Sequence, residues 1–442
     1  MVQRVIAIGV TFGAVACGFR PAAATDGATA IPDAISDVCD PGVVACEGPV
    51  VRTCGDDHHW DASQDHTCDY TCSAGACVEA SNLPLADVAL CTSAAPVLAP
   101  VSGATVSVSD VGGTHLDCSP NCGVAGVTRI DVEKTYAGAP GLAMFCLAKL
   151  VLPAATQLGI PSGGGPKPAI AFVVDGEVTI AGIISFDGGA AGSGSDGGHA
   201  GPGGFDGATK SSDDGTDGQG PCHGSGGTND GPSVIGSDYS GGGGGGAGNL
   251  TIGGDGGDGS CVDGDHHGHG GAHGAVCGTD DLQPLIGGSG GGGGGDATID
   301  GPYGYAGGGG GGGFQISARR SITITGLVSS RGGAGYGTNS IDGGGGGGAG
   351  GGLLFEAPAL MITGTLEVDG GPGGIAGPHL GGAGATANLL AASGVSYTGD
   401  GQGGSGGGGG GGRIRIVGGN ATCVGGVSPA NSCTTGVLPV VP

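Results

Sequence analysis

Three stretches of the chain share one alternating pattern of apolar and polar positions. VTIAGIISFDGG from Val178, ITITGLVSSRGG from Ile322 and LMITGTLEVDGG from Leu360 align without gaps, and a shorter copy, RIRIVGG, begins at Arg413. Alternation of this kind is the period of a β-strand that turns one face inward and the other outward. Because a unit of this length cannot bury its apolar face alone, we expect successive copies to stack.

The repeat therefore predicts a mainly β protein built around a parallel β-helix, or solenoid, with long glycine-rich loops. In that fold Ile324 and Ile362 are equivalent core residues that face inward, whereas Thr323 and Thr363 face outward. A β-sandwich or an antiparallel barrel would need short hairpin turns at even spacing. Long glycine blocks of variable length separate the strand-like phrases instead, which favours the solenoid.

Glycine accounts for 114 of the 442 residues and gathers in blocks such as 241–248, 307–313 and 343–352. Ordering polyglycine costs more backbone entropy than ordering any other chain, so one interpretation is that these blocks are disordered loops hanging from the solenoid. The other is that they form extended threefold helices packed side by side, which only glycine permits where backbones approach closely. The glycine-rich tips of some phage adhesins resemble the second arrangement. The sequence leaves both interpretations open.

Shifts in composition divide the chain into six segments. They are a lipoprotein signal peptide and lipobox at 1–17, a flexible tether at 18–38, a six-cysteine module at 39–78, a strand-rich region leading into the solenoid at 79–168, the glycine-rich β-helix at 169–420, and a tail with a cysteine pair at 421–442. The tether is rich in Ala, Pro and Thr and has no sustained period of a strand or a helix.

The first residues have the features of an export signal. Arg4 precedes an apolar stretch that is too short to span a bilayer but suits the core of a signal peptide. The tetrapeptide AVAC, which ends at Cys17, resembles the lipobox of bacterial lipoproteins, although Ala14 stands where that family usually has leucine. The resemblance implies lipid attachment at Cys17 and a place on the outer membrane or cell surface. The alternative is ordinary cleavage after Ala24, which would give a secreted protein.

Sixteen cysteines indicate an oxidising compartment. Six of them follow the spacing C-x6-C-x7-C-x13-C-x3-C-x4-C over 39–77, and we expect disulfides because a zinc site would need paired C-x2-C knuckles. An even set that could close two further bridges comprises Cys91, Cys118, Cys122 and Cys146. The module resembles small cysteine-rich modules of extracellular myxobacterial proteins. Residues 163–418 resemble the glycine-rich β-helix proteins found as surface lipoproteins in those bacteria, a resemblance that implies location and fold but no activity.

One polar run has the composition of a metal-binding loop. It lies between Cys261 and Cys277 and contains Asp263, Asp265, His266, His267, His269 and His273. Imidazole and carboxylate groups bind zinc, copper or nickel, carboxylates also bind calcium, and a disulfide between the flanking cysteines would hold the loop closed. The competing interpretation is a solvated hydrophilic loop, because its glycine spacers leave the ligands without preorganised support. We expect no required cofactor, and divalent metal binding no tighter than micromolar.

The charge of the chain restricts its partners. With 39 acidic and 13 basic residues the formal net charge is -26, which excludes nucleic acid as a partner. A structural or adhesive surface protein is the predicted function, with the membrane as partner through the lipid anchor and surface polysaccharide or matrix as the candidate ligand.

The alternative function is a carbohydrate-active β-helix enzyme, either a polysaccharide lyase or a hydrolase, which would need clustered carboxylates and a base on one face of the solenoid. Asp187 and Asp369 hold equivalent repeat positions, but Arg331 holds that position in the copy between them and interrupts a ladder of carboxylates. The best basic candidates are Arg319 and Arg320. We therefore predict no catalytic residue.

Overall fold

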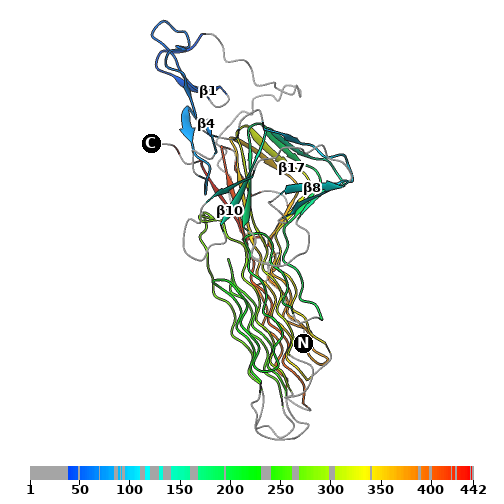
Figure 1. The fold of residues 1–442 in the computed structure, drawn as a ribbon. Helices are drawn as coiled ribbons and strands as arrows, with labels where there is room; N and C mark the ends of the chain where they lie inside the picture. Colours follow the sequence, from blue (N-terminus) through cyan, green and yellow to red (C-terminus); the bar gives the residue numbers. More distant parts are fainter. Residues whose placement is uncertain are drawn as a thin grey trace, which may run out of the picture.

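A computed structural model gives the fold of the chain (Figure 1). It describes residues 38–440 with gaps at 48–49, 69, 84–87, 90, 92–94, 110–114, 120–128, 133–140, 160–167, 194–195, 230–239, 261–267, 298–303, 339–340, 387–389, 398–400, 420, 424–425 and 439. The regular structure of these residues is mainly β.

Each repeat of the sequence forms one coil that contributes a strand to each of three parallel sheets. The three coils are β13 (Ala169–Val174), β14 (Glu177–Ile180) and β15 (Ile183–Ser185); β16 (Gly313–Ala318), β17 (Ser321–Ile324) and β18 (Leu327–Ser329); and β19 (Gly352–Glu356), β20 (Ala359–Ile362) and β21 (Thr365–Glu367). Equivalent strands pair in parallel and in register, so that Ile324 lies between Ile180 and Ile362. This stacking is consistent with the predicted solenoid.

Further strands extend the stack at both ends. On one side lie β6 (Val97–Leu98), β7 (Thr105–Ser109), β8 (His115–Ser119), β9 (Arg129–Val132), β10 (Leu142–Leu147), β11 (Lys149–Leu152) and β12 (Gln157–Gly159); on the other lie β22 (Arg413–Val417), β23 (Gly426–Ser428) and β24 (Cys433–Gly436). The sheet orders are β24-β22-β19-β16-β13-β10-β9, β20-β17-β14-β11-β6 and β23-β21-β18-β15-β12-β7-β8. Only β8 and β9 pair antiparallel to their neighbours in these three sheets.

The space between the sheets holds one continuous apolar core. Ile324 is wholly buried and Ile362 is 3% exposed, whereas Thr323 is half-buried and Thr363 is exposed, so the predicted alternation is confirmed. Phenylalanines of successive coils pack edge to face, with ring centroids 5.7 Å apart for Phe145 and Phe172. Such pairs add to the stabilisation by buried apolar area.

The six-cysteine module is held by disulfides, as predicted. It contains β1 (Val44–Glu47), β2 (Val50–Thr53), β3 (His66–Thr67), β4 (Thr71–Ser73) and β5 (Ala76–Val78). Its bridges join Cys39 to Cys54, Cys46 to Cys72 and Cys68 to Cys77. A fourth bridge, Cys91 to Cys146, ties the following segment to β10, and Cys423 to Cys433 closes the tail.

Residues around the end of this module cover the outer face of the sheet that contains β10, β13, β16 and β19. Val78 and Leu83 belong to a second apolar cluster with Met144, Val173 and Leu354, which point away from the solenoid core. The module is therefore packed against the solenoid over an apolar surface, a contact that its cysteine spacing does not predict.

A buried polar network lies within this contact. The Tyr70 hydroxyl donates to the carbonyl oxygen of Glu356 at 3.1 Å. The Glu356 carboxylate accepts hydrogen bonds from the Ser81 amide at 3.1 Å, from Gln315 Nε2 at 3.0 Å and from Ser317 Oγ at 2.8 Å. Burial raises the pKa of Glu356 above its ordinary value, because the hydrogen bonds offset only part of the lost solvation.

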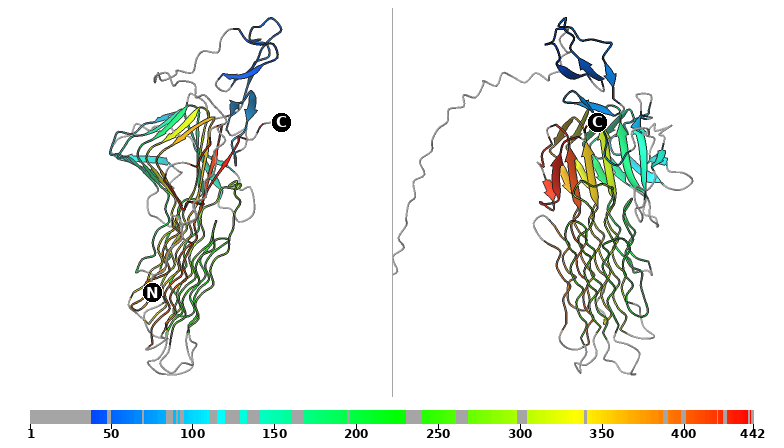
Figure 2. Two further views of the ribbon diagram at one scale, coloured as in Figure 1. Left: turned by 180° about the vertical axis from the view of Figure 1, so that it is seen from behind. Right: turned by 90° about the vertical axis from the view of Figure 1, so that its left-hand side faces the viewer.

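The described residues of 187–312, 330–351 and 368–412 form a second body, here called the glycine bundle, which extends from one side of the three sheets (Figure 2). Its segments are extended and joined by backbone hydrogen bonds at every third residue: the amides of Gly242, Gly245 and Gly248 donate to the carbonyls of Thr228, Ser225 and Cys222. A three-residue repeat without internal bonds is the geometry of the polyproline II helix. For these residues the three-residue hydrogen-bond repeat agrees with the threefold-helix interpretation and not with the disordered-loop interpretation.

The segments with the longest glycine runs lie inside the bundle. Segment 241–248 exchanges backbone hydrogen bonds with neighbours on all sides, namely 222–228, 254–257, 271–274, 292–295, 344–347 and 404–410. A Cβ atom built on Gly244, Gly245 or Gly246 would approach a carbonyl oxygen of a neighbouring segment to well under 3.0 Å. None of these three glycines has a positive φ, so glycine is required there by close approach and not by backbone conformation.

Candidate functional site: the serine groove

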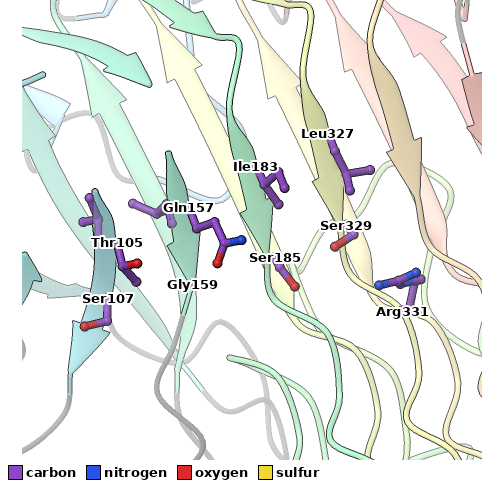
Figure 3. A pocket seen from close by; sticks show the side chains of 11 residues that line it. Thr105, Ser107, Gln157, Gly159, Ile183, Ser185, Leu327, Ser329 and Arg331 are labelled. Carbon is purple, nitrogen blue, oxygen red and sulfur yellow. The ribbon is translucent and has the colours of Figure 1, made fainter. Parts of the chain in front are cut away.

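A groove of about 600 Å³ runs over the outer face of the third sheet, across β7, β12, β15 and β18 (Figure 3). Its floor follows a register ladder in which Gly159 pairs with Ser107 and Ser185, and Ser185 pairs with Ser329. We call this feature the serine groove. The small side chains along this ladder leave the trough open, whereas the equivalent position of the next strand, β21, carries the larger Glu367.

One wall of the groove is a second ladder, two residues earlier in each strand. It consists of Thr105, Gln157, Ile183 and Leu327. Thr105 and Gln157 are exposed, and the two aliphatic side chains are half-buried next to each other. The wall therefore changes along its length from polar to apolar.

Arg331 stands at the other side of the groove, in a ladder of alternating charge. Its Nη2 lies 2.9 Å from Asp187 Oδ2 and its Nη1 lies 3.4 Å from Glu367 Oε2. The hydrogen bonds that Arg331 donates to the Asp187 carboxylate raise the pKa of Arg331 despite partial desolvation. In the next copy, Asp369 accepts a 2.6 Å hydrogen bond from Ser428, and burial raises the pKa of its carboxyl.

The repeat alignment places Asp187, Arg331 and Asp369 at equivalent positions. In the structure these three positions lie next to one another in successive coils. The amide of Gly188 donates to the carbonyl of Arg331, and the amide of Gly332 donates to that of Asp369, so these positions stack on one another. In this stack Asp187 and Arg331 form an ion pair, in place of the turn contact that an Asp-Gly pair usually makes.

Two serines of the floor differ in their bonding. Ser185 Oγ donates to Asp187 Oδ2 at 3.1 Å. Ser329 is 1% exposed, and its hydroxyl has no hydrogen-bond partner among the described residues. A buried hydroxyl without a partner costs about 1–3 kcal/mol, so Ser329 is an unused polar group at the groove.

The two basic residues that the sequence favours do not line the groove. Arg319 forms a 2.9 Å ion pair with Asp175, and its carbonyl accepts a hydrogen bond from Thr71 Oγ1, which places it at the contact with the six-cysteine module. Arg320 is exposed at the turn before β17. Sequence reasoning missed Ser185 and Ser329, although both precede the charged ladder by two residues in aligned copies.

His269 and His273 lie on the surface of the glycine bundle, where each faces an aspartate of the neighbouring segment. Nδ1 of His273 lies 2.6 Å from Oδ1 of Asp255, and Nδ1 of His269 lies 3.8 Å from Oδ1 of Asp258. Against the desolvation of partial burial, the hydrogen bonds and charge of His273 lower the pKa of Asp255.

The remaining members of the predicted metal set, Asp263, Asp265, His266 and His267, lie outside the described residues. Within the described ranges no group of three or more His, Cys, Asp or Glu side chains is arranged to hold a metal ion. The expected disulfide between Cys261 and Cys277 is wrong, because Cys277 pairs with Cys222. The backbones of their two segments lie side by side, with the Ser225 amide bonded to the Ala272 carbonyl.

The lipid-attachment candidate Cys17 also lies outside the described residues. Among the residues that are described, no helix is long and apolar enough to cross a membrane. No protein-family profile, curated protein or solved structure matches the chain.

Proposed function

We propose that the protein is an exported cell-surface protein with a structural or adhesive role, held to the outer membrane by lipid on Cys17. In this proposal the glycine bundle is a stiff rod that projects from the solenoid. The lipobox-like sequence supports the anchor, and the described disulfides support an oxidising, extracellular environment.

The packing of segment 241–248 carries the proposal. A free glycine chain is a flexible coil, but a segment bonded to neighbours on every side moves only with them. Non-glycine side chains such as Asp255, Asp258 and His269 recur at three-residue steps on outer segments and face solvent. The bundle thus combines a stiff interior with a polar surface, which suits a body that projects from a cell.

Two variants test the two parts of the proposal, the lipid anchor and the adhesive role. Cys17→Ala should move the protein from the detergent phase to the aqueous phase in a detergent-partition assay, because the tether has no other membrane-binding feature. An alanine variant that still enters the detergent phase would refute the anchor. Cells that display the protein should adhere to neutral-polysaccharide or matrix-coated surfaces, and Ser185→Trp, which fills the serine groove, should abolish this adhesion while Thr179→Trp, on another sheet, retains it.

The enzyme alternative has weaker support. Asp187 and Glu367, the carboxylates nearest the groove, are both paired with Arg331, which leaves that arginine engaged and not available as a base. Release of reducing or unsaturated sugars from a panel of polysaccharides would favour a hydrolase or a lyase over an adhesive protein.

A further inference from the structure

The serine groove has the shape of a site for an extended chain. Its floor crosses four strands, and because neighbouring strands lie about 4.8 Å apart it is about 14 Å long. The groove runs across the strands, and the backbone groups of these strands are bonded within the sheet. A peptide could not add to this surface as a further strand, so its side chains must provide the recognition.

Those side chains offer hydrogen bonds in both directions. Thr105, Ser107 and Ser185 carry hydroxyls, and Gln157 carries an amide that both donates and accepts.

The half-buried side chains of Ile183 and Leu327 provide an apolar strip beside these polar groups. Such a strip matches the C–H faces of a sugar ring. The combination of dense hydroxyl bonding with a short aliphatic contact is typical of a polyhydroxylated ligand more than of a lipid or an apolar peptide.

Charge decides between a neutral and an acidic ligand. Arg331 is the cation among the lining residues, and it is paired with Asp187 and Glu367. The chain as a whole has a formal net charge of -26, so an anionic polysaccharide would be repelled.

We propose that the serine groove binds a neutral polysaccharide chain along the stacking direction of the solenoid. The inference deepens the adhesive role proposed above, on which it rests, by naming the ligand class. Gluco-oligosaccharides and manno-oligosaccharides are suitable probes, because they carry hydroxyls and no charge.

The experiment is calorimetric titration of the full chain with cellohexaose, maltohexaose, laminarihexaose and mannohexaose, and with hexagalacturonate as the anionic comparator. At least one neutral hexaose should bind, and hexagalacturonate should bind at least tenfold more weakly. Ser185→Trp, which fills the trough, should lower the affinity more than tenfold. Gln157→Ala, which removes one exposed amide, should lower it about threefold to tenfold.

Thr179→Trp is the matched control, because Thr179 faces outward from β14 in the same coil as Ser185 and lies on another sheet. It should bind like the unmodified protein, and thermal melts should show both tryptophan variants folded. Absence of binding by every neutral hexaose, or binding that Ser185→Trp leaves unchanged, overturns the proposal. Glycan binding without cell adhesion would instead contradict the adhesive function and leave the groove assignment standing.

Discussion

Gly245→Ala is the most direct test of the glycine bundle. Gly245 lies in the interior segment 241–248, where its amide donates to Ser225 at 2.9 Å and its carbonyl accepts from Gly292 at 2.9 Å. The added Cβ would meet the carbonyl oxygen of Ala272 on a third segment. Because real Cβ atoms essentially never approach within 3.0 Å of another heavy atom, the segment carrying Ala272 would have to retreat by about 1 Å.

This retreat has a calculable cost. It breaks the hydrogen bonds from Gly271 to Gly243 and from Gly274 to Gly246, both 2.8 Å long. Two lost hydrogen bonds at about 0.5–1.5 kcal/mol each, with about 1–3 kcal/mol of overpacking strain, exceed the gain of about 0.4–1 kcal/mol from a less flexible unfolded chain. We expect a net local destabilisation of about 1–6 kcal/mol.

Hydrogen exchange measured by mass spectrometry reports this loss of local stability for each segment of the bundle. Amides of 268–277 should exchange at least about fivefold faster in Gly245→Ala, since about 1 kcal/mol corresponds to that factor, whereas amides of β17 should be unchanged. Ala272→Val is the control, because Ala272 is exposed on the same segment and can accept extra methyl groups without a contact. Equal protection of 268–277 in the two variants would refute the close-packed interior.

The solenoid could be predicted from the sequence because the alternation of its apolar and polar side chains identifies the strands and their inward faces. Ile324 and Thr323 alternate, and a strand translates this alternation directly into an inward and an outward face. The same alignment placed Asp187 and Arg331 in equivalent positions, although they are 144 residues apart. It could not show that their side chains pair, since that depends on which coils become neighbours.

The glycine bundle was left undecided for the opposite reason. An interior run such as 241–246 has no side chain to set its register or its choice of neighbour, and glycine has the largest entropy to lose. A usable signal lies in the outer segments: GGDGGDG at 253–259 places aspartate at every third residue, where it faces solvent while the glycines face carbonyl oxygens. The pairing of Cys222 with Cys277 follows from the lateral order of these segments, which sequence spacing does not encode.

Two further predictions concern the solenoid and its contact with the module. Ile324→Asp should unfold the neighbouring coils in thermal melts followed by circular dichroism, because it buries a carboxylate among apolar side chains, whereas Thr323→Asp leaves its charge near solvent and should change the melting temperature little. Equal tolerance of both substitutions would contradict the core assignment. Glu356 should give the contact a pH dependence. Its folded-state pKa is raised above the ordinary value of 4.5, so the folded protein binds the proton more tightly than the unfolded chain, and this contribution to stability falls as the pH rises from about 4.5 through the folded-state pKa. Glu356→Gln should therefore gain stability relative to the unmodified protein as the pH rises over this window, and a difference between the two melting temperatures that stays constant from acid to neutral pH would mean that Glu356 ionises without cost.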